Sequence, residues 1–377
     1  MLAVNQYDVA IVGGGVIGLS IAWELSRRGQ KVCVIERDQP GRAASWAGAG
    51  MIPAGPVEEF WRVATPLERL AGLSQRLHRE WHERLLDETG IDNGYLASGS
   101  IYLPCNSASL ADKHRRLLEL GVKVEALEWP DAHDVEPALA PADSAFLLPG
   151  ESQIRNPRHL RALVAACDRN GVRIFAGQAV TACGENDKRM VSVETKNGPI
   201  SAEQFCITAG SWSGVLAAQL GFELPVFPVR GQIALLHGER GILKRIINVG
   251  PRYLVPRSDG RILVGSTMEE VGFDTQTDDE AIADLLEFAA QVAPPLAHLT
   301  VEKTWAGLRP ATPDRLPLLG RLSEFSNVWI ATGHFRAGLQ LSTGTAVLMA
   351  DAISGVEPKL SLEPFAPDRQ SLRCEAL

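Results

Sequence analysis

The sequence predicts an α/β fold that opens with a Rossmann-like β-α-β unit, and three neighbouring segments indicate it. Residues 7–12 form an apolar, β-branched run that ends at Gly13. Residues 16–28 show helical spacing and stop at Gly29, and residues 31–35 are a second apolar run followed by an acid. A strand, a glycine turn, a helix and a second strand in this order predict parallel strands joined by a right-handed crossover.

The turn of this unit carries the glycine spacing G-x-G-x-x-G at Gly13, Gly15 and Gly18, with Val16 and Ile17 before the last glycine. Gly13 permits a tight turn, Gly15 lets the backbone approach a pyrophosphate, and Gly18 lets the helix pack on the strand. Phosphates then lie at the positive end of the helix. The motif predicts that these five residues bind a dinucleotide.

Glu36 follows the second strand, where a carboxylate accepts hydrogen bonds from both ribose hydroxyls and repels a 2′-phosphate. The glycine motif and this acid fit NAD as well as FAD. Residues 37–50 then form a small-residue loop without helix or strand pattern, whereas a nicotinamide enzyme would be expected to continue with an amphipathic helix. No second G-x-G-x-x-G occurs, so we expect the substrate itself to be the electron donor.

Length and composition favour a globular protein of two domains, or of one domain interrupted by another, in 377 residues. A net charge of −8 argues against nucleic acid as a partner. No run reaches the roughly 18 apolar residues that cross a bilayer, and no signal peptide is evident, so we expect a cytoplasmic protein without a transmembrane segment. The six cysteines form no C-x-x-C pair, which predicts neither a zinc site nor disulfides.

Seven blocks along nearly the whole chain share their order and spacing with a known family. They are residues 8–36, 47–51, 207–213, 253–256, 264–268, 305–310 and 333–336. In these blocks the chain resembles the D-amino acid oxidase family of FAD-dependent oxidoreductases. It is most similar to the glycine oxidase branch, which is associated with thiamine biosynthesis.

The resemblance implies a Rossmann-like, discontinuous FAD-binding domain with an inserted α+β substrate domain on a large mixed sheet. The FAD-binding domain would comprise residues 1–90, 150–225 and 315–365. The substrate domain would comprise residues 91–149 and 226–314.

Sequence patterns agree with this outline. Residues 230–236, 253–256 and 261–265 are expected to be extended, with a hairpin turn at residues 258–260. Residues 326–332 are expected to form a short strand.

A helix is expected to follow this last strand, after a turn that begins at Gly333, and to run to Ile353. Its positive end would face the pyrimidine edge of the flavin, where negative charge develops on reduction. Arg336 would reinforce that end or lie on the substrate side. An ordinary surface arginine is the alternative.

The resemblance also assigns contacts to FAD beyond the glycine motif and Glu36. They are Arg37, Ser45, Ala47, Gly48, Gly50, Met51, Val180, Ala209, Gly210, Trp212, His334, Phe335, Arg336, Ala337, Gly338 and Leu339. A cysteine near Gly307 would indicate the covalent flavin of sarcosine oxidases, and none is there. FAD is therefore expected to be held non-covalently.

Three residues are candidates for the chemistry on the substrate. Arg309 matches the family's carboxylate-binding arginine, and bidentate carboxylate binding suits a guanidinium group; a structural salt bridge is the alternative. Tyr253 matches the active-site tyrosine that would give the carboxylate a second hydrogen bond, although a strand tyrosine more often packs at a sheet edge. Met268 would line the pocket wall, although a methionine is usually core filler.

Two further positions bear on the site. His78 and His82 lie one helical turn apart but do not match H-E-x-x-H, so a solvated helix face is expected rather than a metal site. Pro251 stands where relatives often have a histidine two positions before the tyrosine. This departure leaves the recognition of the substrate amine without a predicted residue.

The resemblance implies oxidation of glycine, sarcosine or a small D-amino acid to an imine, which hydrolyses to a keto acid and ammonia or methylamine. Oxygen would accept the electrons and give hydrogen peroxide. Two alternatives stay open: a dehydrogenase that passes electrons to another acceptor, and a non-catalytic flavin-binding assembly protein. A partner from thiazole synthesis and a homo-oligomer are both compatible with the resemblance.

Overall fold

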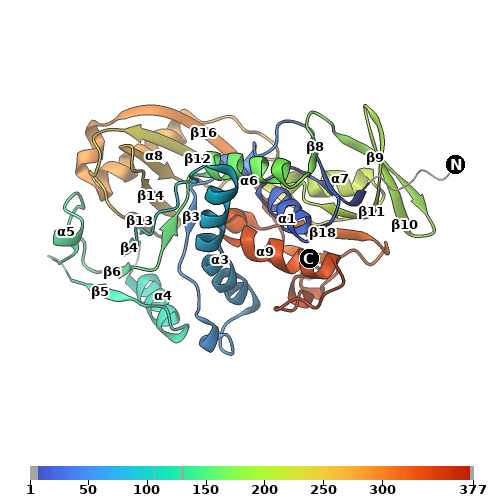
Figure 1. The fold of residues 1–377 in the computed structure, drawn as a ribbon. Coiled ribbons are helices and arrows are strands. Elements are labelled where there is room, and N and C mark those ends of the chain that lie inside the picture. The colour runs from blue at the N-terminus through green and yellow to red at the C-terminus, as the bar shows by residue number, and fades with distance from the viewer. Residues whose placement is uncertain (1–6, 106, 129–130, 374–377) are drawn as a thin grey trace.

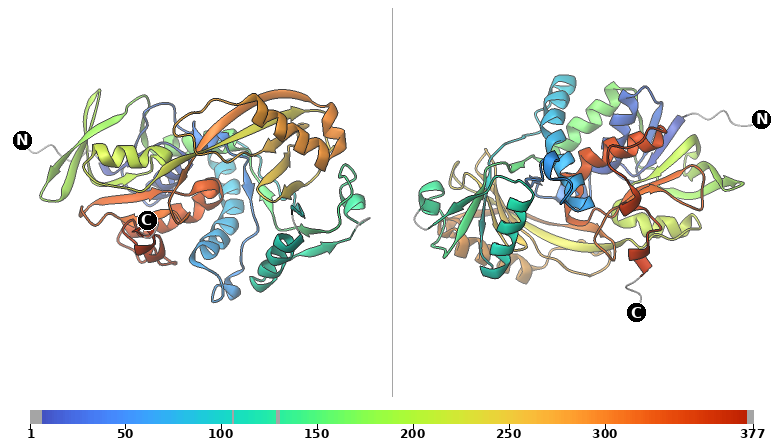
Figure 2. Two further views of the ribbon diagram at one scale, coloured as in Figure 1. Left: turned by 180° about the vertical axis from the view of Figure 1, so that it is seen from behind. Right: turned by 90° about the horizontal axis from the view of Figure 1, so that it is seen from below.

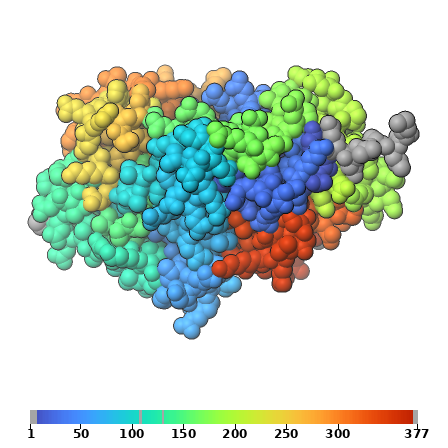
Figure 3. All heavy atoms as spheres, viewed as in Figure 1, coloured from blue at the N-terminus to red at the C-terminus, as the bar shows by residue number. Residues whose placement is uncertain are grey.

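The protein, a computed structural model that describes residues 7–105, 107–128 and 131–373, is built around two eight-stranded sheets. In Figure 1 the sheets lie at opposite sides of the molecule, with the long helix α3 (Pro66–Thr89) between them. The views from behind and from below show the same separation (Figure 2). On the face seen in Figure 3, residues of α3 run down the middle of the surface.

The first sheet holds the predicted β-α-β unit. In sheet order its strands are β17 (Leu318–Arg321), β18 (Val328–Thr332), β11 (Gly198–Ile207), β1 (Tyr7–Val12), β2 (Val32–Ile35) and β8 (Arg173–Phe175), with β10 (Arg189–Thr195) paired to β11 and β9 (Val180–Asn186) to β10. β1 and β2 are parallel and are joined by α1 (Val16–Arg27), as predicted.

The second sheet is mixed. In sheet order its strands are β16 (Thr300–Ala311), β12 (Phe227–His237), β15 (Arg261–Gly265), β14 (Arg252–Pro256), β13 (Ile246–Val249), β4 (Ser100–Leu103), β6 (Ala145–Leu148) and β5 (Glu125–Leu127). β3 (Met51–Ile52) and β7 (Ser152–Gln153) form a separate pair. The three predicted extended segments are confirmed, and β14 and β15 form the predicted hairpin.

The remaining elements are helices. The α-helices not yet named are α2 (Ala44–Ala47), α4 (Ser107–Glu119), α5 (Asp131–Val135), α6 (Asn156–Arg169), α7 (Ser213–Gln219), α8 (Asp279–Val292) and α9 (Gly338–Ile353). The 3₁₀ helices are η1 (Glu58–Phe60), η2 (Gly210–Trp212), η3 (Pro294–His298), η4 (Phe335–Ala337), η5 (Glu363–Phe365) and η6 (Gln370–Arg373).

The described strands are divided between the sheets by sequence segment. Those from residues 1–90, 150–225 and 315–365 build the first sheet and the separate pair. Those from residues 91–149 and 226–314 build the second sheet. This division supports the discontinuous fold class, while the exact domain boundaries stay a prediction.

The prediction of a loop without helix over residues 37–50 is wrong at one place, because α2 covers residues 44–47. Its helical turn is short and begins after Ala43, whose φ is 55°. Four small or aromatic residues without amphipathic spacing give no helical signal in the sequence.

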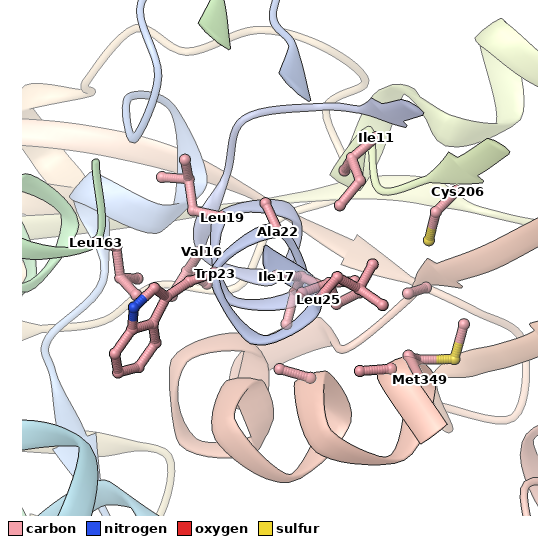
Figure 4. Close-up of a cluster of buried hydrophobic side chains, with 14 of the residues drawn as sticks. Ile11, Val16, Ile17, Leu19, Ala22, Trp23, Leu25, Leu163, Cys206 and Met349 are labelled. Atoms are coloured by element: carbon pink, nitrogen blue, oxygen red, sulfur yellow. The ribbon is translucent and has the colours of Figure 1, made fainter. Parts of the chain in front are cut away.

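The core of the first half surrounds α1. Ala22 and Leu25 of this helix are fully buried, and the helix packs against α6 and α9. Figure 4 shows their side chains among those of Ile11, Leu163 and Met349 from neighbouring elements. Because α9 is fixed against α1, the N-terminal end of α9 has a defined place beside the glycine motif.

Helix α3 begins and ends with strong capping signals. Thr65 and Glu68 form a reciprocal capping box around Pro66, and Gly90 ends the helix in a left-handed conformation with φ 71°. The helix packs against α9. Ser74 links the two helices, because its hydroxyl lies 3.3 Å from the Leu341 carbonyl oxygen.

The prediction that His78 lies on a solvated helix face is wrong. His78 is 1% exposed, and its Nε2 lies 3.1 Å from the carbonyl oxygen of Leu339 and 2.9 Å from that of Gln340. His82 is half-buried, with Nδ1 2.7 Å from Oδ1 of Asn93. Helix α9 covers the face of α3 that carries His78. The spacing of two polar residues in the sequence does not reveal this contact.

No metal centre is built from these histidines. Among the described residues, no group of three or more His, Cys, Asp or Glu side chains is arranged to hold a metal ion. The cysteines of the described ranges are free thiols, and Cys374 lies outside those ranges. No helix in the described part of the chain is long and apolar enough to span a membrane.

Burial of His78 predicts a specific loss of stability in acid. Burial lowers its pKa from 6.5 to about 4. Above pH 6.5 the imidazole is neutral in both states. Between pH 6.5 and pH 4 only the unfolded chain binds the proton. The free energy of unfolding therefore falls by up to roughly 1.4 kcal/mol for each unit by which the pH is lowered. Below the folded-state pKa the loss stops growing.

We therefore expect His78→Gln, which can still donate to the two carbonyls, to flatten the decline of unfolding free energy between pH 6.5 and pH 4. Denaturant titrations across this range measure the slope. His298→Gln, at an exposed histidine of η3, is the matched control and should leave the slope unchanged. An equal slope for His78→Gln and the wild type would contradict the assignment.

Candidate active site

A cavity of about 640 Å³ lies between the two halves of the protein and is lined by residues of both sheets. Its walls include the carboxyl ends of β1 and β2, the loop of residues 42–51 and the start of α9. On the opposite side it is lined by residues of β12, β14 and β16 from the second sheet. The cavity therefore combines the predicted dinucleotide cradle with the predicted substrate residues.

All but one of the predicted FAD contacts line this cavity. The lining contacts are Gly13, Gly15, Val16, Ile17, Glu36, Arg37, Ser45, Ala47, Gly48, Gly50, Met51, Val180, Ala209, Gly210, Trp212, His334, Phe335, Arg336, Ala337, Gly338 and Leu339. Gly18 does not line it. A Cβ at Gly18 would lie 2.0 Å from the Gly13 carbonyl oxygen, so this glycine serves the packing of helix on strand.

The start of α1 has the form of an anion site. Gly15 is the N-cap residue and has no side chain to satisfy the free backbone N–H groups of the first turn. Ser45 accepts one hydrogen bond there, with its Oγ 2.9 Å from Val16 N. Gly13 has φ 117°, and a Cβ on it would lie 2.5 Å from the Thr208 carbonyl oxygen. These features fit a pyrophosphate.

Glu36 is fixed at the wall of the same cavity. Its Oε2 accepts a hydrogen bond from Gly14 N at 2.7 Å, and its Oε1 accepts one from Asp38 N at 2.9 Å. A Cβ at Gly14 would lie 3.1 Å from the Glu36 Cβ. The carboxylate is thus held close to the glycine turn, where a dinucleotide ribose would bind.

Arg37 and Trp212 form the wall next to Glu36. The Arg37 guanidinium carbon lies 3.8 Å from the centroid of the Trp212 ring, which is a cation–π contact. Phe273, in the segment between β15 and α8, packs on the same tryptophan at 5.5 Å between centroids. Residues 226–314, which help to build the second sheet, therefore contact this wall directly.

Arg309 lies on β16 at the other end of the cavity. Its Nη1 donates to the carbonyl oxygens of Arg230 at 3.2 Å and Thr267 at 3.1 Å, and its Nη2 donates to Ser266 Oγ at 2.7 Å. The guanidinium lies against Gly231, where a Cβ would come within 2.0 Å of it. Burial lowers the pKa of Arg309.

No carboxylate forms an ion pair with Arg309 within the described ranges. Its hydrogen bonds to Arg230, Thr267 and Ser266 all go to neutral oxygens. The neighbouring Arg230 is different, because it pairs with Glu269 and with Asp274. A positive charge without an acid partner at the wall of a cavity is suited to an anionic ligand.

Tyr253 lies on β14, is 5% exposed and lines the same end of the cavity. Its ring covers Gly265 of β15, where a Cβ would lie 2.6 Å from the tyrosine ring. Glycine at that position is therefore needed for the ring to lie flat on the sheet. The tyrosine is part of the cavity wall and does not pack at the sheet edge.

Met268 does not line this cavity in the structure, and its role at the wall of the substrate pocket stays a prediction. Met268 is 58% exposed and lines a second depression, which shares Ser266 with the cavity. Ser266, two residues earlier, lines the cavity instead and bonds Arg309. The chain leaves the sheet after Gly265, so the alternation of a strand no longer predicts which side chains face inward.

The turn before α9 forms the remaining wall. His334 is 3% exposed, with Nε2 3.1 Å from Thr345 Oγ1, and burial lowers its pKa to about 3. It is therefore neutral at physiological pH. Arg336 is exposed on the cavity wall, and its Nη2 donates to the Pro251 carbonyl oxygen at 2.7 Å. The predicted strand and helix are β18 and α9, with η4 between them.

Residues 8–352 match the family of FAD dependent oxidoreductases, and the chain belongs to this family. Its cofactor is therefore FAD, and the fit of the glycine turn, Glu36 and the α1 N-terminus to a dinucleotide agrees with this. The resemblance seen in the seven sequence blocks is confirmed.

Within this family the chain is similar to proteins named glycine oxidase. It is 38% identical to one from Pseudomonas aeruginosa, over 95% of this chain and 98% of that protein. The crystal structure of glycine oxidase from Geobacillus kaustophilus matches with a TM-score of 0.91 and 33% identity, covering 97% of this chain and 99% of that one. The bifunctional protein ThiO/ThiG of Trichormus variabilis is 36% identical over 92% of this chain and 52% of its own length.

The geometry of Glu36 predicts its importance for cofactor affinity. Glu36→Ala removes charge-assisted hydrogen bonds worth on the order of 1.5 to 3 kcal/mol, so the dissociation constant of FAD should rise at least tenfold. Quenching of flavin fluorescence on titration of the apoprotein measures it. Asp8→Ala, at an exposed acid of β1, is the control. Unchanged FAD affinity in Glu36→Ala would show that the acid does not contact the cofactor.

Proposed function

We propose that this protein oxidises the Cα–N bond of glycine, or of another small amino acid such as sarcosine or a small D-amino acid, with oxygen as the electron acceptor. The observation that carries the proposal is Arg309, a guanidinium at the cavity wall whose partners are all neutral. Glycine is favoured because the named relatives are glycine oxidases.

The contacts of Arg309 leave the right donors for a carboxylate. Both hydrogens of Nη1 and one of Nη2 are used by the oxygens of Arg230, Thr267 and Ser266. Nε and Nη2 share the edge of the guanidinium that would bind a carboxylate with two parallel hydrogen bonds. The hydroxyl of Tyr253, at the same end of the cavity, would donate a further hydrogen bond to the same carboxylate.

Fixing the carboxylate orients the carbon that is oxidised. Bound FAD supplies the acceptor for two electrons and a proton from the Cα–H bond. The protein's part is positioning, because a neutral amine needs no strong base. His334 lies in the same wall and is neutral, so it adds no positive charge near the amine. The imine then takes up water and releases the keto acid and ammonia.

A role in thiamine thiazole synthesis follows from the same proposal. The relative named ThiO/ThiG joins a segment similar to this chain to a further segment, since the match covers 52% of that protein. We propose that the imine formed here is passed to a thiazole-forming partner. Cytoplasmic location and assembly into a homo-oligomer stay predictions from the sequence.

Anaerobic reduction of the flavin tests the reaction and its acceptor. Without oxygen, glycine should bleach the absorbance band of the oxidised flavin, at roughly 450 nm. When air is admitted, the reduced enzyme should consume oxygen. Bleaching without oxygen consumption would show a dehydrogenase that uses another acceptor. No bleaching with any small amino acid or amine would show a flavin-binding protein without turnover.

Arg309→Leu tests the carboxylate contact. Without the guanidinium the substrate anion is unpaired in the pocket, at a cost of roughly 3 to 5 kcal/mol. We expect kcat/KM for glycine to fall more than a hundredfold, mainly through KM, with normal FAD content. Steady-state oxygen consumption measures both constants.

A simple alkylamine, which has no carboxylate, isolates the contact and should lose far less activity than glycine. Arg321→Leu, at an exposed arginine of β17, is the matched control and should keep full activity. Equal losses for glycine and the alkylamine in Arg309→Leu would mean that Arg309 is structural.

A further inference from the structure

The chain that follows β15 bulges away from β12 before it returns to it. The last register pair of the two strands is Ile233 with Gly265, and the next backbone contact is an isolated bridge between Arg230 and Glu269. Between these pairs the chain has two residues on β12 but three on the other side, residues 266–268. An extra residue of this kind disrupts the ladder locally, and such bulges are frequent next to active sites.

The guanidinium of Arg309 lies in this bulge of residues 266–268. It lies against Gly231 of β12 and donates to Ser266 Oγ and to the Thr267 carbonyl oxygen on the bulged side. On the β12 side it donates to the carbonyl oxygen of Arg230. Its acceptors thus belong to both edges of the bulge, so the position of the guanidinium depends on how the two edges are held together.

A cluster of side chains on the opposite face of the sheet ties the bulge to β12. Gly231 lines the cavity, and alternation along the strand places its neighbours Arg230 and Gln232 on the other face. Arg230 Nε donates to Glu269 Oε2 at 2.7 Å, and Gln232 Nε2 donates to Glu269 Oε1 at 2.8 Å. The backbone N of Gln232 donates to Thr267 Oγ1 at 2.9 Å. Both oxygens of Glu269 are therefore bound by residues of β12.

Glu269 is the member of this cluster that is connected most directly to Arg309. Its backbone N donates to the Arg230 carbonyl oxygen at 3.0 Å, and the same oxygen accepts from Arg309 Nη1 at 3.2 Å. Burial raises the pKa of the Glu269 carboxyl, but the neighbouring Thr267, Gln232 and Arg230 lower this pKa more. The side chain is therefore a charged carboxylate at neutral pH, and it does not line the cavity.

We infer that Glu269 is a positioning residue, which orients Arg309 for the substrate carboxylate from the far face of the sheet. Its carboxylate ties the bulge to β12 and thereby fixes the main-chain oxygens that hold the guanidinium. A bidentate contact needs the edge of the guanidinium in one orientation, so a looser bulge weakens carboxylate binding although the charge of Arg309 remains. The inference rests on the proposed function, because it takes Arg309 as the group that binds the carboxylate.

Equilibrium binding of acetate to the oxidised holoenzyme measures the carboxylate contact without turnover. Acetate has the carboxylate of glycine and no amine, and the change in flavin absorbance reports its binding. Glu269→Ala should raise the dissociation constant of acetate about tenfold, because the bidentate geometry is lost. Asp274 still pairs with Arg230 in this variant, which supports its folding. The matched control is Glu270→Ala, because this neighbouring acid is 69% exposed and pairs with the exposed Arg315. It should leave acetate binding unchanged.

Turnover separates positioning from a general structural loss. In Glu269→Ala, kcat/KM for glycine should fall about tenfold, mainly through KM, whereas kcat/KM for a simple alkylamine should change less than about twofold. The double variant with Glu269→Ala and Arg309→Leu should lose no more than Arg309→Leu alone, because both changes act on one contact. FAD content and thermal melting check the fold. If the alanine variant does not fold, Glu269→Gln replaces it, because the new amide nitrogen would face Gln232 Nε2, which is also a donor.

Each other outcome contradicts a defined part of the argument. Unchanged acetate binding in Glu269→Ala, together with lost binding in Arg309→Leu, would overturn the inference and leave the proposed function standing. Equal losses for glycine and the alkylamine in Glu269→Ala, or a double variant weaker than Arg309→Leu, would show a general structural role and overturn it as well. Equal acetate binding by the wild type and by Arg309→Leu would contradict the proposed function and the inference together.

Discussion

The site depends on a guanidinium group that is held in place without an acid. Arg309 is fixed by two backbone carbonyls and a serine hydroxyl, which orient it and leave its charge uncompensated. A carboxylate in their place would hold the arginine more strongly but would also neutralise its charge. Arg230, one strand away, pairs with two acids and gives only its backbone carbonyl to Arg309. The two arginines therefore have separate roles, one in structure and one at the cavity.

Hydrogen bonds between the two halves of the protein bring this arginine to the dinucleotide cradle. Ser211 Oγ donates to the Leu308 carbonyl oxygen at 2.7 Å, directly beside Arg309 in the chain. Arg257 Nη2 donates to the Ala49 carbonyl oxygen at 2.7 Å, and burial lowers the pKa of this arginine to about 10. Each contact joins a side chain on one half to the backbone of the other. These contacts to main-chain atoms hold the cofactor end and the substrate end of the cavity together. Main-chain acceptors stay in place when the side chains of Leu308 or Ala49 are substituted.

Local patterns in the sequence predicted those parts of the structure that depend on neighbouring residues. The β-α-β unit, the β14–β15 hairpin and α9 have periodicity, glycines and turn residues within a short window. His78 was misplaced because its burial results from contact with α9, which is distant in sequence. Met268 lies beyond the end of β15, so strand alternation does not predict the direction of its side chain.

Asn156, which lines the cavity, has no motif around it in the sequence: it is the first residue of α6, after the N-cap Arg155 and before a proline. Its contact to Ser45 bridges residues 111 positions apart in the chain. In the structure the glycines at 48 and 50 leave room for its amide.

Arg336, like Arg309, is held by a main-chain oxygen. Pro251 has no polar side chain, but its carbonyl oxygen accepts a hydrogen bond from Arg336. That contact anchors a cation of the cavity wall on backbone, as Arg309 is anchored on the carbonyls of Arg230 and Thr267. A backbone acceptor persists whatever residue stands at position 251, so the loss of a histidine there removes a side-chain contact without releasing the arginine.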